Sequence, residues 1–433
     1  MIQYVKQGGD FGRAFIQQLK ERSANSGKKV DDAVAEIVET VRRNGDAAVR
    51  MYTERFDGSV PEQLVIEKAD MQELIKACDP AFVAALERAA ANIRDFHARQ
   101  KQQSWLQTEA NGVIMGQRVR GLARVGLYVP GGTAAYPSSV LMNAIPAKIA
   151  GVKELVMVTP PGKDGKPNPD ILAAALVAGV DRVFLVGGAQ AVAALAFGTE
   201  SIPKVDKIVG PGNIFVATAK RQLYGTVDID MIAGPSEILI LADDTANPEF
   251  LAADLMSQAE HDPLASSILL TTSARIAEET IAAVYRQIEG LSRKDIINQS
   301  LDNFGAVMLC NDMEEEVEFA NALAPEHLEV CAANPMEFIG KIDNAGSVFL
   351  GNWSPEPLGD YFAGPNHVLP TSGTARFFSP LSVDSFVKKS SFIYYTQDAL
   401  MQAKEDIIKL AETEGLTAHA NSIRVRDKQE AAN

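Results

Sequence analysis

The sequence predicts an α/β protein with two parallel-sheet domains, an N-terminal helical region and a C-terminal tail. Between about residues 113 and 375, short β-rich runs alternate with helical stretches, and several of the runs end in glycine or proline. This alternation indicates parallel strands joined by helical crossovers. The chain has 433 residues, 46% hydrophobic and 22% charged, so it can form more than one core of ordinary globular composition.

Residues 1–112 are expected to form a helical region. Over 31–43 the apolar residues recur at helical spacing and the pattern stops at Asn44-Gly45, and 80–100 repeats the same pattern. Both apolar faces are narrow, so these helices must pack on another part of the protein. His97 lies one step past the second apolar stripe among basic residues, and we expect it to be solvated.

Residues 113–234 are expected to form the first α/β domain. We expect strands at 125–129, 155–158, 183–186 and 207–209, and helices at 140–150, 169–178 and 190–197. The strands lead into loops that include Pro130-Gly-Gly132, Gly187-Gly188 and Gly210-Pro-Gly-Asn213. Ligands of such sheets bind beyond the carboxyl ends of the strands, where these loops fall. No complete GxGxxG follows a strand, so the loops fit phosphate cradles and tight turns equally well.

Residues 235–375 are expected to form a second α/β domain, with strands at 237–242, 267–271, 305–310, 328–331 and 347–350. The segment Asp254-Leu-Met-Ser-Gln-Ala-Glu-His261 should be the crossover helix between its first two strands. Gln258 and His261 are three residues apart, so they share one face near the end of that helix, before Pro263. The pair is either half of a metal site or a helix end at which a histidine is favoured by the helix dipole.

Other histidines also stand beside acidic residues. Glu326 and His327 are adjacent and follow Pro325, and His419 follows Glu414 by five residues. A carboxylate and an imidazole side by side could serve one substrate as two bases, or they could form a solvated turn. A ligand set of histidine, glutamine and aspartate without sulfur suits zinc or a similar divalent ion.

Residues 376–433 are expected to form a tail that docks on another domain or subunit, because this segment is too small for a core of its own. We expect a helix over 398–411 and a strand over 422–426.

Composition excludes several classes of function. A formal net charge of −15 argues against a nucleic-acid partner and against binding to an anionic membrane surface. The three cysteines, Cys78, Cys310 and Cys331, lie far apart, so a disulfide framework and a cysteine zinc site are not expected. The N-terminus lacks the features of a signal peptide, and no segment reads as a membrane span. We therefore expect a cytoplasmic protein.

Several segments together resemble histidinol dehydrogenases, in the same order and from about residue 30 to the C-terminus. They are Val125-Gly-Leu-Tyr-Val-Pro-Gly-Gly132, Val186-Gly-Gly-Ala-Gln-Ala191, Gly210-Pro-Gly-Asn213, Ala233-Gly-Pro-Ser-Glu237, Ser257-Gln-Ala-Glu-His261, Pro325-Glu-His-Leu328, Gly359-Asp360 and Leu416-Thr-Ala-His419. The resemblance implies oxidation of L-histidinol to L-histidine through histidinaldehyde with two NAD⁺, the last step of histidine biosynthesis. It also implies one zinc ion per subunit and a domain-swapped homodimer of two incomplete Rossmann-like domains, in which the tail reaches the partner's active site.

The same resemblance assigns roles to individual residues. The zinc ligands are Gln258, His261, Asp360 and His419, which also bind the substrate together with Ser236, Glu326, His327 and Glu414. The general bases are Glu326 and His327, and the NAD contacts are Tyr128, Gln190 and Asn213. His367, within Gly364-Pro-Asn-His-Val-Leu-Pro370, is expected to be structural.

Two rival interpretations remain at this point. A related enzyme of the same fold that oxidises another polyol or a sulfonated alcohol would be expected to change the amine-binding end, yet Glu414 and Ser236 are both present. A zinc-dependent binding protein without turnover would have no use for the bases Glu326 and His327.

Overall fold

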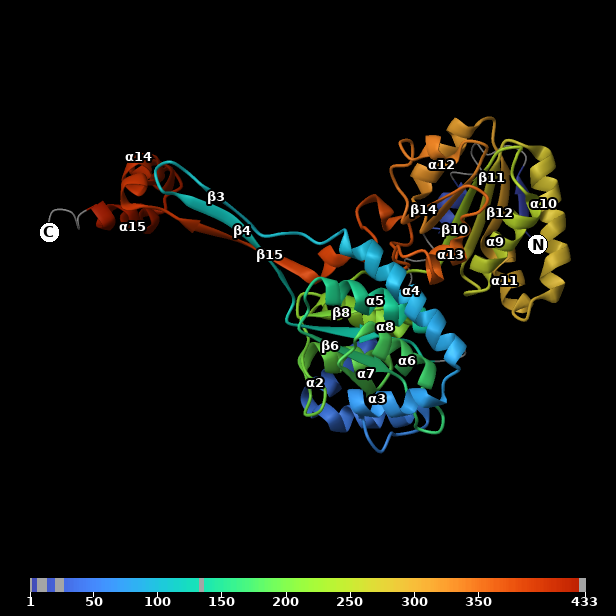
Figure 1. Cartoon of the computed structure of the whole chain (residues 1–433), viewed down its shortest axis with the longest axis horizontal. Coiled ribbons are helices and arrows are strands. Elements are labelled where there is room, and N and C mark those ends of the chain that lie inside the picture. Colours follow the sequence, from blue (N-terminus) through green and yellow to red (C-terminus); the bar gives the residue numbers. More distant parts are fainter. Residues whose placement is uncertain (1, 6–13, 20–26, 132–135, 428–433) are drawn as a thin grey trace. The chain divides into compact units, whose positions relative to one another are not determined.

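The protein, described by a computed structural model at residues 2–5, 14–19, 27–131 and 136–427, divides into two compact units (Figure 1). The first unit comprises Met1–Lys101 and Leu122–Phe386, and the second comprises Gln102–Gly121 and Val387–Asn433. These units differ from the ranges expected from the sequence, because residues 102–121 join the C-terminal tail. Gly132 of the first glycine loop lies outside the described residues.

The first sheet of the first unit has the strand order β2-β7-β6-β5-β8-β9. Its strands are β2 (Val65–Glu67), β5 (Arg124–Tyr128), β6 (Glu154–Thr159), β7 (Arg182–Leu185), β8 (Lys207–Val209) and β9 (Asp228–Ile229). All neighbours are parallel except β2, which runs antiparallel to β7. After β2, the chain forms β5 in the middle of the sheet, continues outward through β6 and β7, and then crosses to β8 on the other side of β5. The order of strands therefore reverses between β5 and β8, as in a Rossmann-like half.

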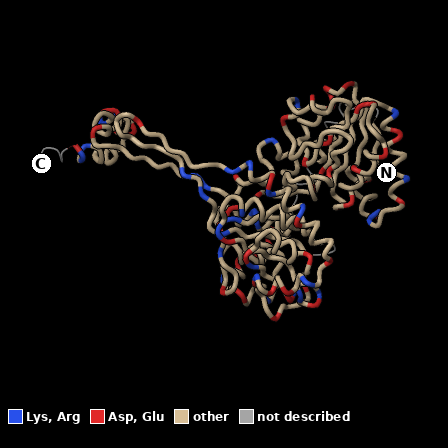
Figure 2. The backbone as a smooth tube through the Cα atoms, viewed as in Figure 1, with Lys and Arg blue, Asp and Glu red and all other residues tan. Residues whose placement is uncertain are grey.

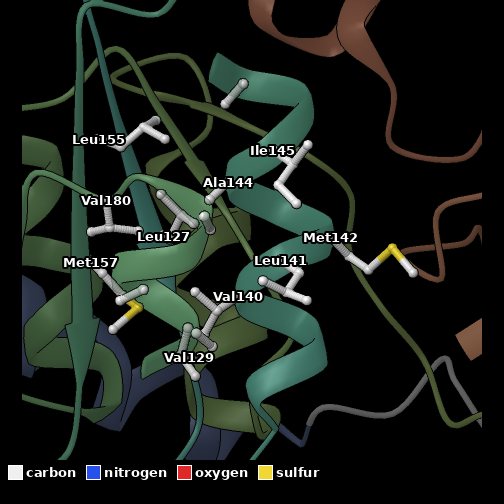
Figure 3. Close-up of a cluster of buried hydrophobic side chains, with 14 of the residues drawn as sticks. Leu127, Val129, Val140, Leu141, Met142, Ala144, Ile145, Leu155, Met157 and Val180 are labelled. Carbon is white, nitrogen blue, oxygen red and sulfur yellow. The ribbon is translucent and has the colours of Figure 1, made fainter. Parts of the chain in front are cut away.

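Helices cover both faces of this sheet. They are α5 (Pro137–Ile149), α6 (Pro169–Ala178), α7 (Gly188–Phe197) and α8 (Ile214–Leu223). Residues of α5, including Val140, Leu141 and Ile145, pack against Leu127 of β5 and Leu155 of β6 (Figure 3). Helices α5, α6 and α7 are apolar on most of their circumference, which is why they are buried within the domain.

The N-terminal region packs on the sheets instead of standing apart from them. Its helices are α2 (Lys28–Asp57), α3 (Lys68–Leu74) and α4 (Pro80–Ala98), and α2 breaks at Gly45, where φ is +51°, so the expected helices and the break are confirmed. The region also contains two short strands that were not expected, because β1 (Gln3–Val5) pairs with a strand of the second sheet and β2 pairs with β7.

His97 corrects another expectation. Its side chain is fully buried, and its Nδ1 lies 2.7 Å from Oε1 of Gln100. It lies one helical turn beyond the buried Ile93, so it continues the apolar stripe of α4 instead of facing solvent.

The second sheet of the first unit has the order β1-β12-β11-β10-β13-β14 and is parallel throughout. Its strands after β1 are β10 (Glu237–Ala242), β11 (Ser266–Thr271), β12 (Gly305–Leu309), β13 (His327–Cys331) and β14 (Ser347–Leu350). The helices of this region are α9 (Pro248–Ala259), α10 (Ala274–Gln287), α11 (Lys294–Phe304), α12 (Met313–Leu323) and α13 (Glu356–Tyr361). The prediction of an α/β fold with parallel-sheet domains is confirmed, and this sheet reverses its strand order between β10 and β13.

The second unit contains an antiparallel sheet and two helices. The sheet has the order β15-β4-β3, with β3 (Trp105–Thr108), β4 (Ile114–Gly121) and β15 (Val387–Tyr394), and the helices are α14 (Gln397–Thr413) and α15 (Thr417–Asp427). The strand expected at 422–426 is wrong, because these residues belong to α15. Ile423 and Val425 alternate with polar residues over too few positions to distinguish a strand from a helix that packs on α14.

Charged residues of both signs are distributed along the backbone of both units (Figure 2). Among the described residues, no helix is both long enough and apolar enough to span a membrane.

Candidate active site

The candidate active site lies at the amino ends of β10 and β13 in the second sheet. His327 is the first residue of β13, and Glu326 directly precedes it. His327 pairs in register with Ile238 of β10, and Ser236 directly precedes that strand. Strands β10 and β13, between which the strand order reverses, therefore bring Ser236, Glu326 and His327 together at their amino ends. Ligands of parallel sheets usually bind at the carboxyl ends, and here the cluster lies at the opposite ends.

The main chain of Glu237 orients both candidate bases. Nδ1 of His327 donates to the carbonyl oxygen of Glu237 over 3.0 Å. Oε2 of Glu326 accepts a hydrogen bond from the backbone N–H of the same residue over 2.9 Å. Because Nδ1 carries the proton of a neutral His327, Nε2 is the basic nitrogen. Nε2 is buried and has no hydrogen-bond partner among the described residues, and it lies 3.8 Å from Oδ1 of Asp360.

The electrostatics of the cluster differ from those of a solvated turn. Burial disfavours a charge on His327, but Glu326, Asp360 and Glu356 outweigh burial and raise the pKa of His327 to about 10. Burial raises the pKa of Glu326 to about 7, against the influence of His327. Burial also acts against the Asp360 carboxylate, yet its contacts with His327 and His367 hold the pKa of Asp360 below its usual range. Groups with such perturbed pKa values are typical of functional sites.

Glu356 is a member of the cluster that the sequence did not reveal. Its Oε1 lies 3.9 Å from Nε2 of His327, and its side chain is buried. His327, Glu356 and Asp360 form a group whose ligand atoms all lie within 4.8 Å of one another, so they could hold a metal ion. The available signal was the spacing of Glu356 and Asp360, four residues apart on α13, which places two carboxylates on one face of a helix.

Gln258 lies in the last turn of α9, whereas His261 follows the C-cap residue Glu260, because the helix ends earlier than expected. Gln258 is buried, and its Oε1 has no hydrogen-bond partner among the described residues. The pKa of His261 is lowered by burial, and the Asp360 carboxylate acts on this pKa in the opposite direction. An orphaned buried amide oxygen, an imidazole and a carboxylate are ligand types that suit a divalent ion such as zinc.

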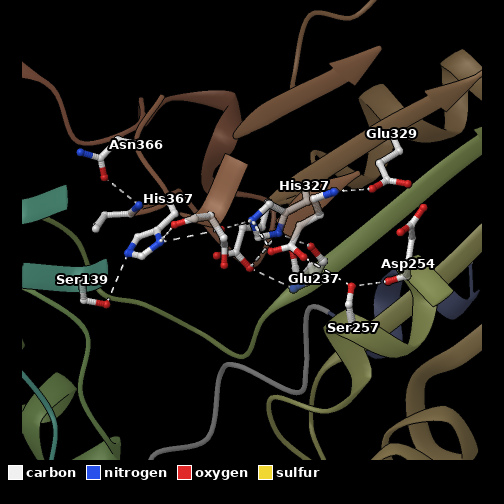
Figure 4. A network of polar contacts seen from close by, with 12 residues as sticks. Ser139, Glu237, Asp254, Ser257, His327, Glu329, Asn366 and His367 are labelled. Atoms are coloured by element: carbon white, nitrogen blue, oxygen red, sulfur yellow. Dashed lines mark hydrogen bonds and ion pairs between the residues drawn. The ribbon is translucent and has the colours of Figure 1, made fainter. Parts of the chain in front are cut away.

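A cavity of about 210 Å³ opens beside the cluster. His327, Asp360 and His367 contribute polar groups to its lining, and Phe349, Leu358 and Leu369 contribute apolar surface. His367 lies between the cluster and Ser139 of α5 (Figure 4). Its Nδ1 donates to the carbonyl oxygen of Asp360 over 3.0 Å, and its Nε2 lies 3.3 Å from the Ser139 hydroxyl oxygen.

The three residues expected to contact NAD lie around the carboxyl ends of the first sheet. Tyr128 ends β5, Gln190 lies in the first turn of α7, and Asn213 caps α8, so Tyr128 and Asn213 flank the point at which the strand order reverses. The Tyr128 hydroxyl oxygen accepts a hydrogen bond from Gly188 N–H over 3.0 Å, and burial raises the pKa of Tyr128 to about 12. Both polar side-chain atoms of Gln190 are buried without a partner among the described residues, which suits a residue that binds a ligand.

Glu414 and His419 lie in the second unit. Glu414 is the C-cap of α14, His419 lies in α15, and both are exposed in this chain.

Comparison with known proteins identifies the family. The sequence profile described as histidinol dehydrogenase matches residues 20–427. The chain is 56% identical over 428 residues to a histidinol dehydrogenase of Clostridium acetobutylicum, with 99% of both chains covered. It is 57% identical over 410 residues to a histidinol dehydrogenase of Listeria monocytogenes, covering 95% of this chain and 96% of that protein. The chain belongs to the histidinol dehydrogenase family.

The fold agrees with this assignment. The crystal structure of histidinol dehydrogenase from Elizabethkingia anophelis matches with a TM-score of 0.92 and 39% identity, covering 99% of each chain. The predicted resemblance is therefore confirmed, and with it the expectation of an NAD-dependent oxidoreductase of histidine biosynthesis.

Proposed function

We propose that this chain oxidises L-histidinol to L-histidine through histidinaldehyde, with one zinc ion per subunit and two NAD⁺ as hydride acceptors, as the last step of histidine biosynthesis. The observation that carries the proposal is the buried Glu326–His327 pair, whose side chains are both held by the main chain of Glu237. Two bases of different chemistry in one buried site suit a reaction that removes a hydroxyl proton and then activates water.

The residues that would hold zinc are Gln258, His261 and Asp360, with His419 supplied by a second copy of the chain. Two observations support this set: the oxygen of the buried Gln258 has no hydrogen-bond partner among the described residues, and Asp360 acts to raise the pKa of His261 against the effect of burial. Bound zinc would supply positioning, because it would hold the amino and imidazole groups of histidinol with the alcohol carbon directed toward the nicotinamide.

His327 would remove the hydroxyl proton through Nε2 as the first hydride leaves. His327 must be neutral before it can accept a proton. The surrounding carboxylates raise the pKa of His327 to about 10, which favours its protonated form at neutral pH. A divalent cation beside Asp360 would make protonation of His327 less favourable, because a nearby like charge lowers the pKa of an imidazole. Metal occupancy and the basicity of His327 are therefore coupled in this site.

Glu326 would then activate the water that attacks the enzyme-held aldehyde. With its pKa raised to about 7, this carboxyl group exchanges its proton close to neutral pH, where a general base works most efficiently. The hydrogen bond from Glu237 N–H to Oε2 fixes the carboxylate beside His327. Collapse of the hydrated aldehyde would release the second hydride to a second NAD⁺.

NAD would bind along the carboxyl ends of β5, β7 and β8, through Tyr128, Gln190 and Asn213. The N-termini of α7 and α8 lie at these strand ends, and helix N-termini attract phosphate groups.

The active enzyme would be a homodimer in which each tail completes the partner's site. Glu414 and His419 are exposed in the chain, and they lie in the small second unit. Glu414 from one copy would pair with the cationic amino group of the substrate bound to the other, and Ser236 would provide a further contact.

Two variants test the assignment of the bases. His327→Asn should slow NADH formation by about 100-fold or more, since general-base catalysis contributes factors of that size, while zinc remains bound. Glu326→Gln should impair the second oxidation more than the first, so that the NADH formed per histidinol falls from two toward one. Turnover of folded His327→Asn protein near the wild-type rate would overturn the proposal.

A further inference from the structure

We propose that the buried ion pair between Lys220 and Asp230 is a clamp that shapes the loop Gly210-Pro-Gly-Asn213 for NAD. The proposal rests on the proposed function, in which Asn213 contacts NAD. Lys220 and Asp230 would be positioning residues, because they act on the cofactor only through this loop.

Both charges of the pair bind the backbone of one residue, Gly210. Nζ of Lys220 donates to the carbonyl oxygen of Gly210 over 2.9 Å. Oδ2 of Asp230 accepts a hydrogen bond from the Gly210 N–H over 2.8 Å. The ammonium and the carboxylate also contact each other directly. Gly210 is therefore held at its N–H and at its carbonyl group by two groups that are themselves paired.

The loop needs such restraint because its backbone adopts a conformation that only glycine takes up readily. The φ angle of Gly210 is +115°, and a Cβ added there would meet the carbonyl oxygen of Tyr128 at 2.1 Å. Gly210 thus lies against the backbone of Tyr128, the proposed NAD contact at the end of β5. A glycine in this position has more conformational freedom than other residues, so outside contacts must hold it.

The end of the loop is fixed by the helix that carries Lys220. Oδ1 of Asn213 accepts hydrogen bonds from Phe215 N–H over 3.0 Å and from Val216 N–H over 3.2 Å, which starts α8. Lys220 follows Asn213 by seven residues, two helical turns, so its side chain can reach back toward the loop at the start of its own helix.

Asp230 anchors the clamp to the rest of the domain. Its Oδ1 accepts a hydrogen bond from Met231 N–H over 2.7 Å. The side chains of Lys220 and Asp230 are only 4% and 2% exposed. A buried ion pair is often no more stabilising than apolar residues of the same volume. Its hydrogen bonds to a cofactor loop give this pair a role that apolar side chains could not fill.

The test compares steady-state kinetics and NAD⁺ binding by calorimetry for Lys220→Met and for the double variant Lys220→Met/Asp230→Asn. The double variant contains no unpaired buried charge, so it remains informative if the single variant does not fold. Both should raise the KM for NAD⁺ by about tenfold or more, because loss of groups that orient binding residues typically costs factors of 10 to 100. The KM for histidinol should change far less.

Lys207→Met is the matched control. Lys207 donates to Asp228 over 2.8 Å, and its side chain is 8% exposed, but this pair lies at the amino ends of β8 and β9, away from the loop. The control should keep the KM for NAD⁺ within about twofold of wild type, since it removes a buried lysine without releasing Gly210.

Asn213→Ala separates the clamp from the proposed function. If Asn213→Ala raises the KM for NAD⁺ and the folded clamp variants do not, the clamp is overturned and the proposed cofactor site stands. If Asn213→Ala has no effect on NAD⁺ binding, the proposed cofactor site fails. Unfolding of both clamp variants, under conditions where Lys207→Met stays folded, would assign the pair to stability alone and would also overturn the clamp.

Discussion

At the scale of single residues, the candidate site depends on one strand neighbour, Glu237. Its N–H and its carbonyl group bind Glu326 and His327, so the geometry of both proposed bases follows from the pairing of β10 with β13. A substitution that kept Glu326 and His327 but shifted this pairing would disorganise the site. The main-chain role of Glu237 has no signature in the sequence.

Two candidate sets of metal ligands share Asp360, and zinc content distinguishes them. The proposed set contains His261, whereas the group observed around His327 contains Glu356. We expect His261→Asn to weaken zinc binding by at least about tenfold, since loss of a ligand exceeds the usual effect of losing a supporting residue. We expect Glu356→Gln to keep its zinc. The measurement is zinc per subunit by mass spectrometry after gel filtration, and zinc loss from Glu356→Gln alone would contradict the proposed set.

The adjacent pair Glu326-His327 could be selected from the sequence because two titratable residues stand side by side in a chain with five histidines. Glu356 and His97 were missed or misjudged for a different reason. The role of Glu356 depends on the direction of α13, and the burial of His97 depends on what packs against α4, and neither is encoded in local spacing.

At the scale of elements, α12 carries a buried acid that makes stability depend on pH. Burial raises the pKa of Glu316 from 4.5 to about 9. A folded-state pKa above the unfolded value means that the native state holds the proton more tightly. This contribution to stability is fully present below about pH 4.5 and is lost as pH rises through about 9.

Glu316→Gln should therefore flatten part of the fall in stability between neutral and alkaline pH. The free energy of unfolding of the variant minus that of the wild type should increase from pH 5 to alkaline pH. The increase should reach up to a few kcal/mol, since each pKa unit corresponds to about 1.4 kcal/mol. Melting temperatures across this pH range measure the effect. Glu318→Gln on the exposed face of the same helix is the control. Parallel pH profiles for wild type and Glu316→Gln would contradict the prediction.

Elements with a strong local signal were predictable. The parallel strands are apolar runs bounded by glycine or proline, and the amphipathic helices α2 and α4 have clear apolar stripes. The three-residue strands β1 and β2 were not predictable, because each is defined by its partner strand and not by its own sequence. The helix at 422–426 was misjudged because five alternating residues fit both periods.

At the scale of the whole chain, the two large sheets share one strand order but place their candidate sites at opposite strand ends. In the first sheet the proposed NAD contacts surround the carboxyl ends of β5 and β8, and in the second the proposed bases lie at the amino ends of β10 and β13. Alternating strands and helices predict two such sheets. This alternation does not predict which strand ends carry the candidate sites, because that depends on the side chains around those ends.

The proposed sharing of active sites between subunits can be tested by mixing inactive variants. His327→Asn affects the first unit and His419→Asn the second, and each homodimer should be nearly inactive. If each tail completes the partner's site, a heterodimer of the two contains one intact site, so random pairing should restore roughly a quarter of the sites. The activity of co-expressed, differently tagged subunits measures this. Isolated heterodimers that show no activity would contradict a shared site.

A zinc-dependent, four-electron oxidation of histidinol can be tested by measuring the NADH formed per L-histidinol consumed. Absorbance should be followed in untreated enzyme, after chelation, and after zinc is restored. We expect two NADH per histidinol, with NADH formation lost on chelation and recovered with zinc. Absence of NADH from histidinol in folded, zinc-loaded dimer would contradict this expectation.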